Sequence, residues 1–396
     1  MKKICSILIC FFLVCSLAAC EAENIIVKIK TFNLVEYMTE RVDWDSKVIE
    51  ELKTGGRYKY YFNRLSNKEK QAYNNVLSVI ENLPESVAVP YLNPEELTAV
   101  FEALLYDNPS LFFLGRGCTT ATNGLSVQFV PQYTMDAVEY NRRIRLLTQK
   151  AEEILSKTAD KDPFEKELFF HDYIIENCAY AFNSTPDEGT AYGALVNGKA
   201  SCEGYSKAMQ LLSDMAEIDC FIITGVASGP GGNENHMWNI VGLDGDFYHL
   251  DVTWDDPVSP ESGENGDDPI YTYFNITDEE IKITHSQFFK DIVCSSQKEN
   301  YFTKKGLLFN SFNNSEKAKI VALVKSALDT GRKSVEFKFS DQNVYNKALS
   351  SLFINGDIYT IMRKVNTLSS GENSIESLSY IRKDDFKILE LYLILD

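Results

Sequence analysis

Three short segments between residues 197 and 257 carry a thiol, an imidazole and a carboxylate, in that order. They read GKASCEGY with Cys202, NHMWN with His236 and HLDVTWDDP with Asp251. A thiolate attacks carbonyl carbon, and an imidazole takes the thiol proton and returns it to a leaving amine. A carboxylate bonded to the other ring nitrogen fixes the tautomer. These residue types predict a nucleophile, a base and an orienting group.

Cys202 is predicted to lie in the first turn of a helix. Gly198 marks a turn before it, and residues 203–218 repeat at helical spacing. The apolar face of this helix comprises Ala208, Leu211, Leu212 and Met215. The N–H groups and the dipole at a helix start favour thiolate over thiol, and Gly204 lets another backbone segment come close. The alternative for Cys202 is a small buried residue without a chemical role.

His236 and Asp251 are predicted to meet across a β-hairpin. Met237–Val241 and Phe247–Val252 have the composition of strands, and Asp244-Gly245 lies at the centre of the turn between them. Antiparallel pairing brings the start of the first strand beside the end of the second. The imidazole and the carboxylate therefore become neighbours.

These segments resemble the transglutaminase-like superfamily of papain-type thiol enzymes, in its bacterial secreted branch. The family pattern is Gly-x-x-x-Cys-x-Gly-Tyr, His-x-Trp-Asn and Tyr-His-x-Asp-x-Thr-Trp-Asp-Asp-Pro, and the match runs from about residue 163 to 257. The resemblance implies an α+β fold with a transglutaminase-like, papain-like core, in which the nucleophile helix packs on an antiparallel sheet. By position it implies Cys202 as nucleophile, His236 as base and Asp251 as orienter.

The chain departs from the animal transglutaminases in one position of this pattern. Those enzymes have a Trp directly after the Cys and carry calcium-binding loops, whereas Glu203 follows Cys202 here. The resemblance therefore implies neither cross-linking activity nor calcium dependence. No cofactor and no metal site are expected.

The other cysteines and histidines carry weaker signals. Cys178 and Cys220 lie in apolar segments and are predicted to be core residues. His171 is predicted to pack or to be hydrogen-bonded, while His249 either supports Asp251 or is simply a solvated or hydrogen-bonded side chain; no pattern indicates a role for His285. The five cysteines after residue 20 form neither a disulfide framework nor a zinc pattern: Cys118, Cys178, Cys202, Cys220 and Cys294.

The first nineteen residues have the features of a lipoprotein signal peptide. Lys2 and Lys3 precede an apolar run from Ile4 to Leu17, and the sequence LAAC ends at Cys20. We expect cleavage before Cys20 and a lipid on its sulfur, which would anchor the protein in the cell envelope, on a bacterial membrane and facing outside the cytoplasm. The alternative is a plain secretory signal that is cut nearby.

The formal charge excludes some partners. It is −18 for the whole chain and −18 − 2 = −20 without the two lysines of the signal. A strongly acidic surface argues against nucleic acid and against adhesion to anionic lipid. The lipid is then the membrane contact, and a protein or peptide is the expected substrate. The oligomeric state is left open.

The chain is predicted to divide into a signal peptide, residues 1–19, and three further parts. Residues 20–159 form a mainly helical region, with helices starting at Ser66 and Asn93, two strand-like pieces at 111–114 and 126–133, and a long helix over 135–157. Residues 160–300 form the catalytic domain, which includes a flexible loop at 225–235. Residues 301–396 form a small α+β region. The aromatic residues around 58–62 and 106–113 are expected to be core, with a substrate-facing patch as the alternative.

Two classes of function fit these features. The first is a thiol enzyme that acts on amide or isopeptide bonds of proteins or peptides through an acyl-thioester, by hydrolysis or transamidation. The second is a surface binding protein that keeps the fold without turnover. The three intact residues of the site favour the first.

Overall fold

The computed structural model describes residues 59–122, 127–182, 184–229, 232–257, 269–286, 288, 291–369 and 374–395, together with the backbone of strands β1 (Phe11–Cys15) and β2 (Ile25–Ile29). Cys20, and the predicted signal segment apart from β1, lie outside the described residues. Contacts divide the chain into two units: the first consists of Met1–Asp244 and His285–Lys290, and the second of Gly245–Thr284 and Asp291–Asp396. The predicted domain boundaries remain predictions.

The N-terminal part of the first unit combines helices with a sheet. Helices α3 (Tyr60–Arg64), α4 (Asn67–Leu77) and α5 (Pro94–Tyr106) accompany the five-stranded sheet β1-β2-β4-β5-β3. Strands β3, β4 and β5 comprise Val87–Val89, Leu114–Thr122 and Val127–Tyr133. The sequence indicated only two strands here. The other members of the sheet were not predicted, because they are short or pair across long separations in sequence.

The predicted helix starts at Ser66 and Asn93 are confirmed. In each case the cap side chain accepts the N–H of the third helical residue, while the Glu at that position accepts the N–H of the cap residue. This reciprocal pair satisfies two backbone donors that a helix start leaves without partners. The prediction at 111–114 is wrong, since residues 111–113 form a turn and the strand begins at Leu114.

Aromatic side chains connect the N-terminal part of this unit to its central sheet. Tyr60 stacks on Phe221 with ring centroids 4.6 Å apart, and the Tyr61 hydroxyl donates to the carbonyl oxygen of Ile222 at 3.1 Å. The aromatic residues expected to be core are buried where the structure describes them: Tyr60, Tyr61, Phe62, Tyr106, Phe112 and Phe113. The core interpretation of this cluster is confirmed.

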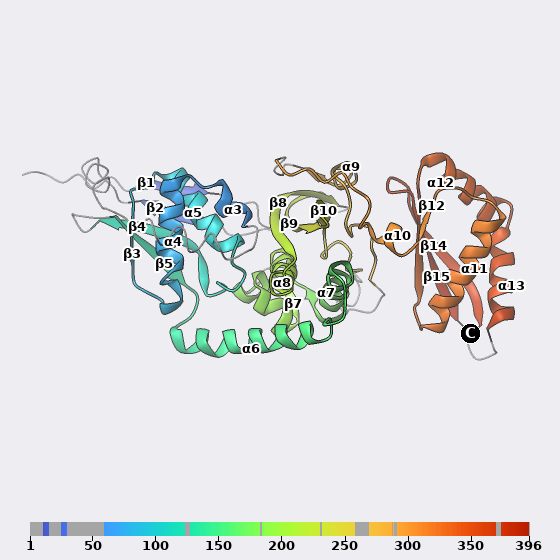
Figure 1. Cartoon of the computed structure of the whole chain (residues 1–396), viewed down its shortest axis with the longest axis horizontal. Coiled ribbons are helices and arrows are strands. Elements are labelled where there is room, and N and C mark those ends of the chain that lie inside the picture. The colour runs from blue at the N-terminus through green and yellow to red at the C-terminus, as the bar shows by residue number, and fades with distance from the viewer. Residues whose placement is uncertain are drawn as a thin grey trace, which may run out of the picture. The chain divides into compact units, whose positions relative to one another are not determined.

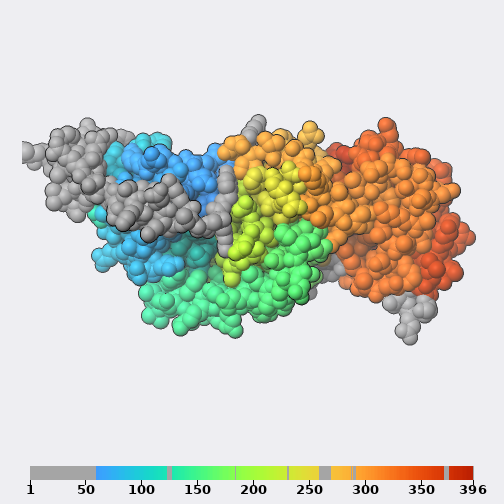
Figure 2. Space-filling model, in the orientation of Figure 1, coloured from blue at the N-terminus to red at the C-terminus, as the bar shows by residue number. Residues whose placement is uncertain are grey.

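Two long helices precede the candidate site. Helix α6 (Ala137–Ser156) follows β5, and helix α7 (Pro163–Asn177) leads to Cys178. Figure 2 shows the atoms of α6, in blue-green, on the surface of the molecule. That position suits its sequence, which is amphipathic and buries Tyr140, Leu147, Ala151 and Ile154.

The central element of the first unit is helix α8 (Cys202–Met215), which packs against strands β8 (Asp219–Gly229) and β9 (Gly232–Leu243) (Figure 1). The sheet has the order β10-β9-β8-β11, where β10 is Asp246–Leu250 and β11 is His285–Ser286. Short strands β6 (Ala179–Tyr180) and β7 (Lys199–Ala200) pair in parallel directly before α8. The expected arrangement, a nucleophile helix on an antiparallel sheet, is present.

The predicted flexible loop over residues 225–235 is instead the distal part of a long hairpin. Gly225 pairs with His236, and the register continues without a break to Gly229 opposite Gly232. The glycines and the proline at its tip indicated a loop, but the pairing of both flanks continues the two strands almost to the turn. Residues 230 and 231 lie outside the described residues.

The C-terminal part of the second unit is an α+β layer, as predicted. Strands pair in the order β12-β13-β15-β14, and helices α11 and α13 pack side by side (Figure 1). Its strands are Leu308–Phe309, Ser334–Phe339, Ile375–Lys383 and Ile388–Leu395 for β12 to β15, and its helices are Asn314–Asp329, Gln342–Leu349 and Asp357–Leu368 for α11 to α13. Two short helices precede it, α9 (Asp278–Ile281) and α10 (Tyr301–Lys304). Within the described part of the chain, no helix is both long and apolar enough to cross a membrane.

Candidate active site

Cys202 is the first residue of helix α8, as predicted. The preceding residue, Ser201, has extended backbone and donates its N–H to the carbonyl oxygen of Glu188 at 2.8 Å, while its own carbonyl accepts from Tyr205 N at 3.0 Å. Gly198, with φ of 67°, turns the chain before β7. Cys202 therefore lies at the positive end of the dipole of a 14-residue helix.

Gly204 lets the start of α8 lie against a neighbouring segment. A Cβ at this position would lie 2.5 Å from the carbonyl oxygen of Glu188 and 2.6 Å from the Ala200 side chain. The Tyr205 hydroxyl adds a second tie by donating to the carbonyl of Cys178 at 2.6 Å. Packing of residues 178–200 against the helix thus fixes where Cys202 lies.

Cys118, Cys178, Cys220 and Cys294 form no disulfides in this structure. The thiolate is the reactive form of a cysteine, so the chemistry expected of Cys202 is that of the reduced protein.

His236 lies in strand β9, which packs on α8. The side-chain amide of Asn239, three residues along the strand, donates to the carbonyl oxygen of Ser206 at 3.0 Å. This bond ties the strand that carries the imidazole to the helix that starts at Cys202. His236 is buried, and its ring lies parallel to that of Trp238 with centroids 6.1 Å apart.

The turn between β9 and β10 has the predicted form. Asp244 and Gly245 both have positive φ, 51° and 84°, which is the signature of a type I′ hairpin turn. Asp251 directly follows β10, which ends at Leu250, two residues before the predicted end at Val252. The two-residue Asp-Gly turn thus sets the pairing register of the hairpin, and this register determines where Asp251 lies.

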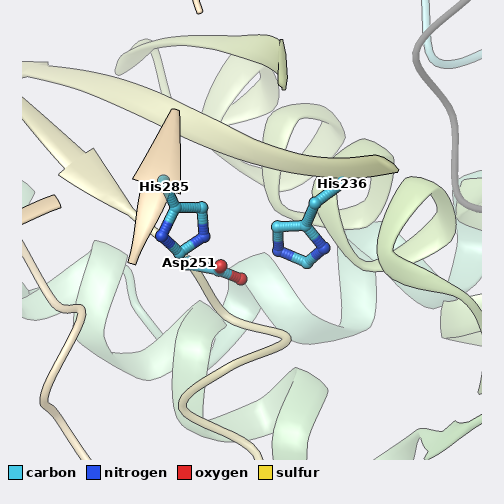
Figure 3. A group of neighbouring side chains, drawn as sticks. All are labelled: His236, Asp251 and His285. Carbon is cyan, nitrogen blue, oxygen red and sulfur yellow. The ribbon is translucent and has the colours of Figure 1, made fainter. Parts of the chain in front are cut away.

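Backbone groups hold the Asp251 carboxylate in place. One of its oxygens, Oδ1, accepts from the N–H groups of Thr253 and Trp254, both at 3.1 Å. The side chain is fully buried. A nitrogen of His236, a nitrogen of His285 and a carboxylate oxygen of Asp251 all lie within 4.8 Å of one another, and Figure 3 shows the carboxylate between the two rings. The structure brings together His236 and Asp251, as predicted, and adds His285.

His285 is the site residue that sequence analysis missed. It lies in the two-residue strand β11, where it pairs with Ala227 of β8, and its ring centroid is 5.4 Å from that of His236 and 4.8 Å from that of Trp238. A Cβ on Gly225 would lie 2.7 Å from the Trp238 ring, so glycine leaves room for this packing. A strand of two residues has no periodicity to detect, and only its pairing places His285 here.

A buried group of charges lies directly after Cys202. Glu203 accepts from Arg116 at 2.6 Å and from Lys207 at 2.7 Å. Burial raises the pKa of Glu203, but the Lys207 ammonium and the Arg116 guanidinium outweigh it, so the pKa lies below the usual range. A cavity of about 410 Å³ borders these three side chains, with an apolar wall that includes Leu111 and Phe112. The residue that distinguishes this chain from animal transglutaminases thus belongs to an ion-pair network.

The remaining predictions about cysteines and histidines have clear outcomes. Cys178 and Cys220 are buried core residues, and His171 is buried with Nδ1 2.9 Å from Asp172 Oδ1, as predicted. His249 is buried and hydrogen-bonded, which was one of the predicted alternatives, since its Nε2 lies 2.9 Å from Asp278 Oδ1. Cys20 lies outside the described residues.

Comparison with protein families identifies the domain. Residues 148–252 match the family model described as the transglutaminase-like superfamily. This range contains Cys202, His236 and Asp251. The chain therefore contains a transglutaminase-like domain with an α+β fold, and the family supports an enzyme of the cysteine acyl-transfer class. A comparison with functionally curated proteins finds no match.

Solved structures are similar over part of the chain. A crystal structure of a TGase shares 12% identity with a TM-score of 0.26, over 44% of this chain and 51% of that one. A provisionally assigned cysteine protease from Cytophaga hutchinsonii shares 14% (TM-score 0.23; 32% and 51%). A provisionally assigned protease from Parabacteroides distasonis shares 14% (TM-score 0.21; 33% and 30%). This chain spans about half the length of the first two, and the family assignment depends on the family model.

Proposed function

We propose that this protein is a cysteine acyl-transfer enzyme that acts on amide or isopeptide bonds of proteins or peptides. Cys202 is the nucleophile, His236 the base and Asp251 the group that orients His236. The observation that carries the proposal is the position of His236, within 4.8 Å of the buried Asp251 carboxylate and on the strand that packs against the helix beginning at Cys202.

The reaction follows from the roles of the three side chains. The reduced Cys202 sulfur attacks the carbonyl carbon of the amide, and the carbonyl oxygen takes the electron pair of its π bond. His236, which holds the thiol proton, transfers it to the leaving nitrogen as the C–N bond breaks. A thioester and a free amine result. Asp251 stabilises the imidazolium and holds the ring in the productive tautomer.

The second half of the reaction regenerates the thiol. Water or an amine attacks the thioester carbonyl while His236 accepts its proton, and the Cys202 sulfur leaves with that proton. Water gives hydrolysis and an amine gives transamidation. Both reactions use the same three side chains. Analysis of the products is therefore needed to show whether water or an amine accepts the acyl group.

The test is chemical labelling of the reduced full-length protein. Iodoacetamide near neutral pH should modify Cys202 faster than the four free cysteines, because the helix start and His236 both favour its thiolate. Mass spectrometry after incubation with a model peptide should then find an acyl group on Cys202, and its mass defines the donor. The matched control is Cys178→Ser, which removes a buried thiol and should leave both results unchanged.

Two outcomes would contradict the assignment. Equal labelling of all five cysteines in the folded protein would remove Cys202 as nucleophile. Rapid labelling of Cys202 without any acylation by a broad panel of peptides and thioesters would favour the binding protein that retains the fold without turnover.

We further propose that Cys20 carries a lipid that anchors the enzyme in the cell envelope, on the outer side of a bacterial membrane. The apolar segment that ends in LAAC supports this proposal. Cys20→Ala should move the protein from the membrane fraction to the soluble fraction without changing its thermal unfolding. Retention of this variant on membranes would point to another attachment.

A further inference from the structure

A second group of His, Asp and Cys side chains lies outside the proposed active site. His249 is in strand β10, Asp278 is the first residue of helix α9, and Cys294 precedes helix α10. One ligand atom of each, an imidazole nitrogen, a carboxylate oxygen and the sulfur, lies within 4.8 Å of the others. His249 and Cys294 are buried, while 24% of the Asp278 side chain is exposed.

Backbone hydrogen bonds hold the three positions together. His249 and Ile276 exchange two bonds of 2.9 Å, which places α9 beside β10. The N–H of Asp278 donates to the carbonyl of Cys294 at 2.7 Å, and the N–H of Cys294 donates to Asp278 Oδ2 at 3.4 Å. All three side chains therefore start from backbone that is fixed without any contribution from a bound ion.

The three ligand types suit a transition-metal ion. Thiolate and imidazole select zinc-like ions over Mg²⁺ and Ca²⁺, which prefer oxygen ligands. Zinc sites often combine three protein ligands with a fourth position open to water. At usual Zn–N and Zn–S distances of roughly 2.0 and 2.3 Å, tetrahedral ligand atoms lie roughly 3.5 Å apart. His249 Nε2 and Asp278 Oδ1, 2.9 Å apart, would separate slightly, and side-chain rotations that move the remaining ligand atoms by about 1 Å would close the site.

Charge and access are also favourable. A divalent ion bound by the Asp278 carboxylate and the Cys294 thiolate, with neutral His249, leaves no net charge in this buried site. The thiol proton passes to solvent as the S–metal bond forms. The exposed edge of Asp278 provides the route by which an ion enters and the position for a water ligand.

We propose that His249, Asp278 and Cys294 bind a divalent transition-metal ion of the Zn²⁺ class. The sequence does not predict this site, because Asp278 is 29 residues from His249 and 16 from Cys294, and neither interval is a zinc-binding spacing. The bound metal would take no part in the reaction at Cys202. Its expected role is to tie β10, α9 and the segment before α10 together.

The experiment uses Co²⁺ as a spectroscopic probe of the full-length chain. Cys202→Ser serves as the background, so that the proposed nucleophile supplies no thiolate. Protein treated with a chelator and kept reduced is titrated with Co²⁺. We expect visible bands of tetrahedral cobalt together with a near-ultraviolet thiolate-to-cobalt band, which saturate at one equivalent. Added Zn²⁺ should abolish both and raise the temperature of unfolding.

Matched variants assign the signal. Cys294→Ser should remove the thiolate band, whereas Cys118→Ser, which replaces another buried cysteine, should keep it. His236→Gln should also keep it, which excludes the group formed by His236, Asp251 and His285. Asp278→Asn retains an oxygen and amide hydrogen bonds, so it is expected to fold while binding Co²⁺ at least about tenfold more weakly.

Two results would overturn the metal site. One is the absence of a thiolate–cobalt band in the folded background protein. The other is an equal band in the Cys294→Ser variant. If Cys294→Ser fails to fold, the comparison of Asp278→Asn with the background decides, because equal affinity there would also exclude the site.

Discussion

The proposed active site and the proposed metal site use the same three side-chain types in different settings. In one, Cys202 begins helix α8, and His236 lies close to the buried carboxylate of Asp251. In the other, Cys294 lies in a segment without helix or strand, near His249 and Asp278. Burial, followed by the charge of Asp278, raises the pKa of the Cys294 thiol to about 12. Without a metal, that sulfur is a poor nucleophile.

We expect the backbone around each thiol to decide its chemistry. A helix start offers N–H groups and a positive dipole end to the sulfur, whereas an irregular buried segment offers desolvation alone. The carboxylates differ in the same way. Asp251 is fully buried and accepts two backbone N–H groups, while the pKa of partly exposed Asp278 is lowered chiefly by its hydrogen bond to His249.

The largest difference between the two groups is expected when the carboxylate of each is replaced by an amide and the rate of Cys202 acylation is measured. Asp251→Asn should lower the rate of Cys202 acylation by about 10- to 10³-fold, because the amide favours the wrong tautomer of His236 and leaves the imidazolium without an acceptor. The loss is smaller than the roughly 10⁴-fold of the serine protease precedent, since a thiolate–imidazolium pair forms before substrate binds. Asp278→Asn should leave the rate within about twofold.

Acylation by a model thioester and thermal unfolding are measured in the same preparations of both variants. Unchanged acylation in Asp251→Asn, while Cys202→Ala and His236→Ala abolish it, would mean that another residue orients the base. A large loss in Asp278→Asn would mean that the two groups are coupled.

A smaller effect is expected at His285, whose ring packs beside those of His236 and Trp238. As a positioning residue beside His236 and Asp251, it should hold the carboxylate and the Trp238 ring in place. His285→Gln should lower acylation on the order of tenfold and shift its pH profile, because the group that faces Asp251 changes. His171→Gln is the matched buried control and should affect stability alone. An unshifted pH profile in His285→Gln would assign it a packing role.

The smallest effect concerns the ion pairs of Glu203 and is a change in stability. Because the folded pKa of Glu203 lies below its unfolded value, its contribution is present above the unfolded pKa and is lost as pH falls through the folded pKa. Arg116→Ala weakens this depression, so the variant should lose stability at a higher pH than the wild type. At pH 7 the cost should be about 1–2 kcal/mol, less than for a fully buried pair, because 32% of the Arg116 side chain is exposed.

Urea unfolding between pH 3 and 7 measures this effect. Arg142→Ala provides the control, because Arg142 pairs with Glu139 on the exposed surface of α6 and should change nothing measurable. Parallel pH profiles for wild type and Arg116→Ala would show that the network does not stabilise the Glu203 carboxylate.

The sequence by itself determined the features that depend on near neighbours. The capping boxes at Ser66 and Asn93, the helix start at Cys202 and the Asp244-Gly245 turn all follow from groups a few residues apart. Because that turn sets the hairpin register, the approach of His236 to Asp251 was predictable as well. Local hydrogen bonds and backbone preferences carry this information.

Only the tertiary structure decided which distant segments meet. His285 joins the site through a two-residue strand on β8, and His249, Asp278 and Cys294 gather from three elements. The segment 225–235, predicted as a loop, is part of a hairpin because the residues on its two sides pair with each other. These outcomes depend on pairings and burial between residues far apart in sequence, and such contacts leave no periodicity or spacing along the chain.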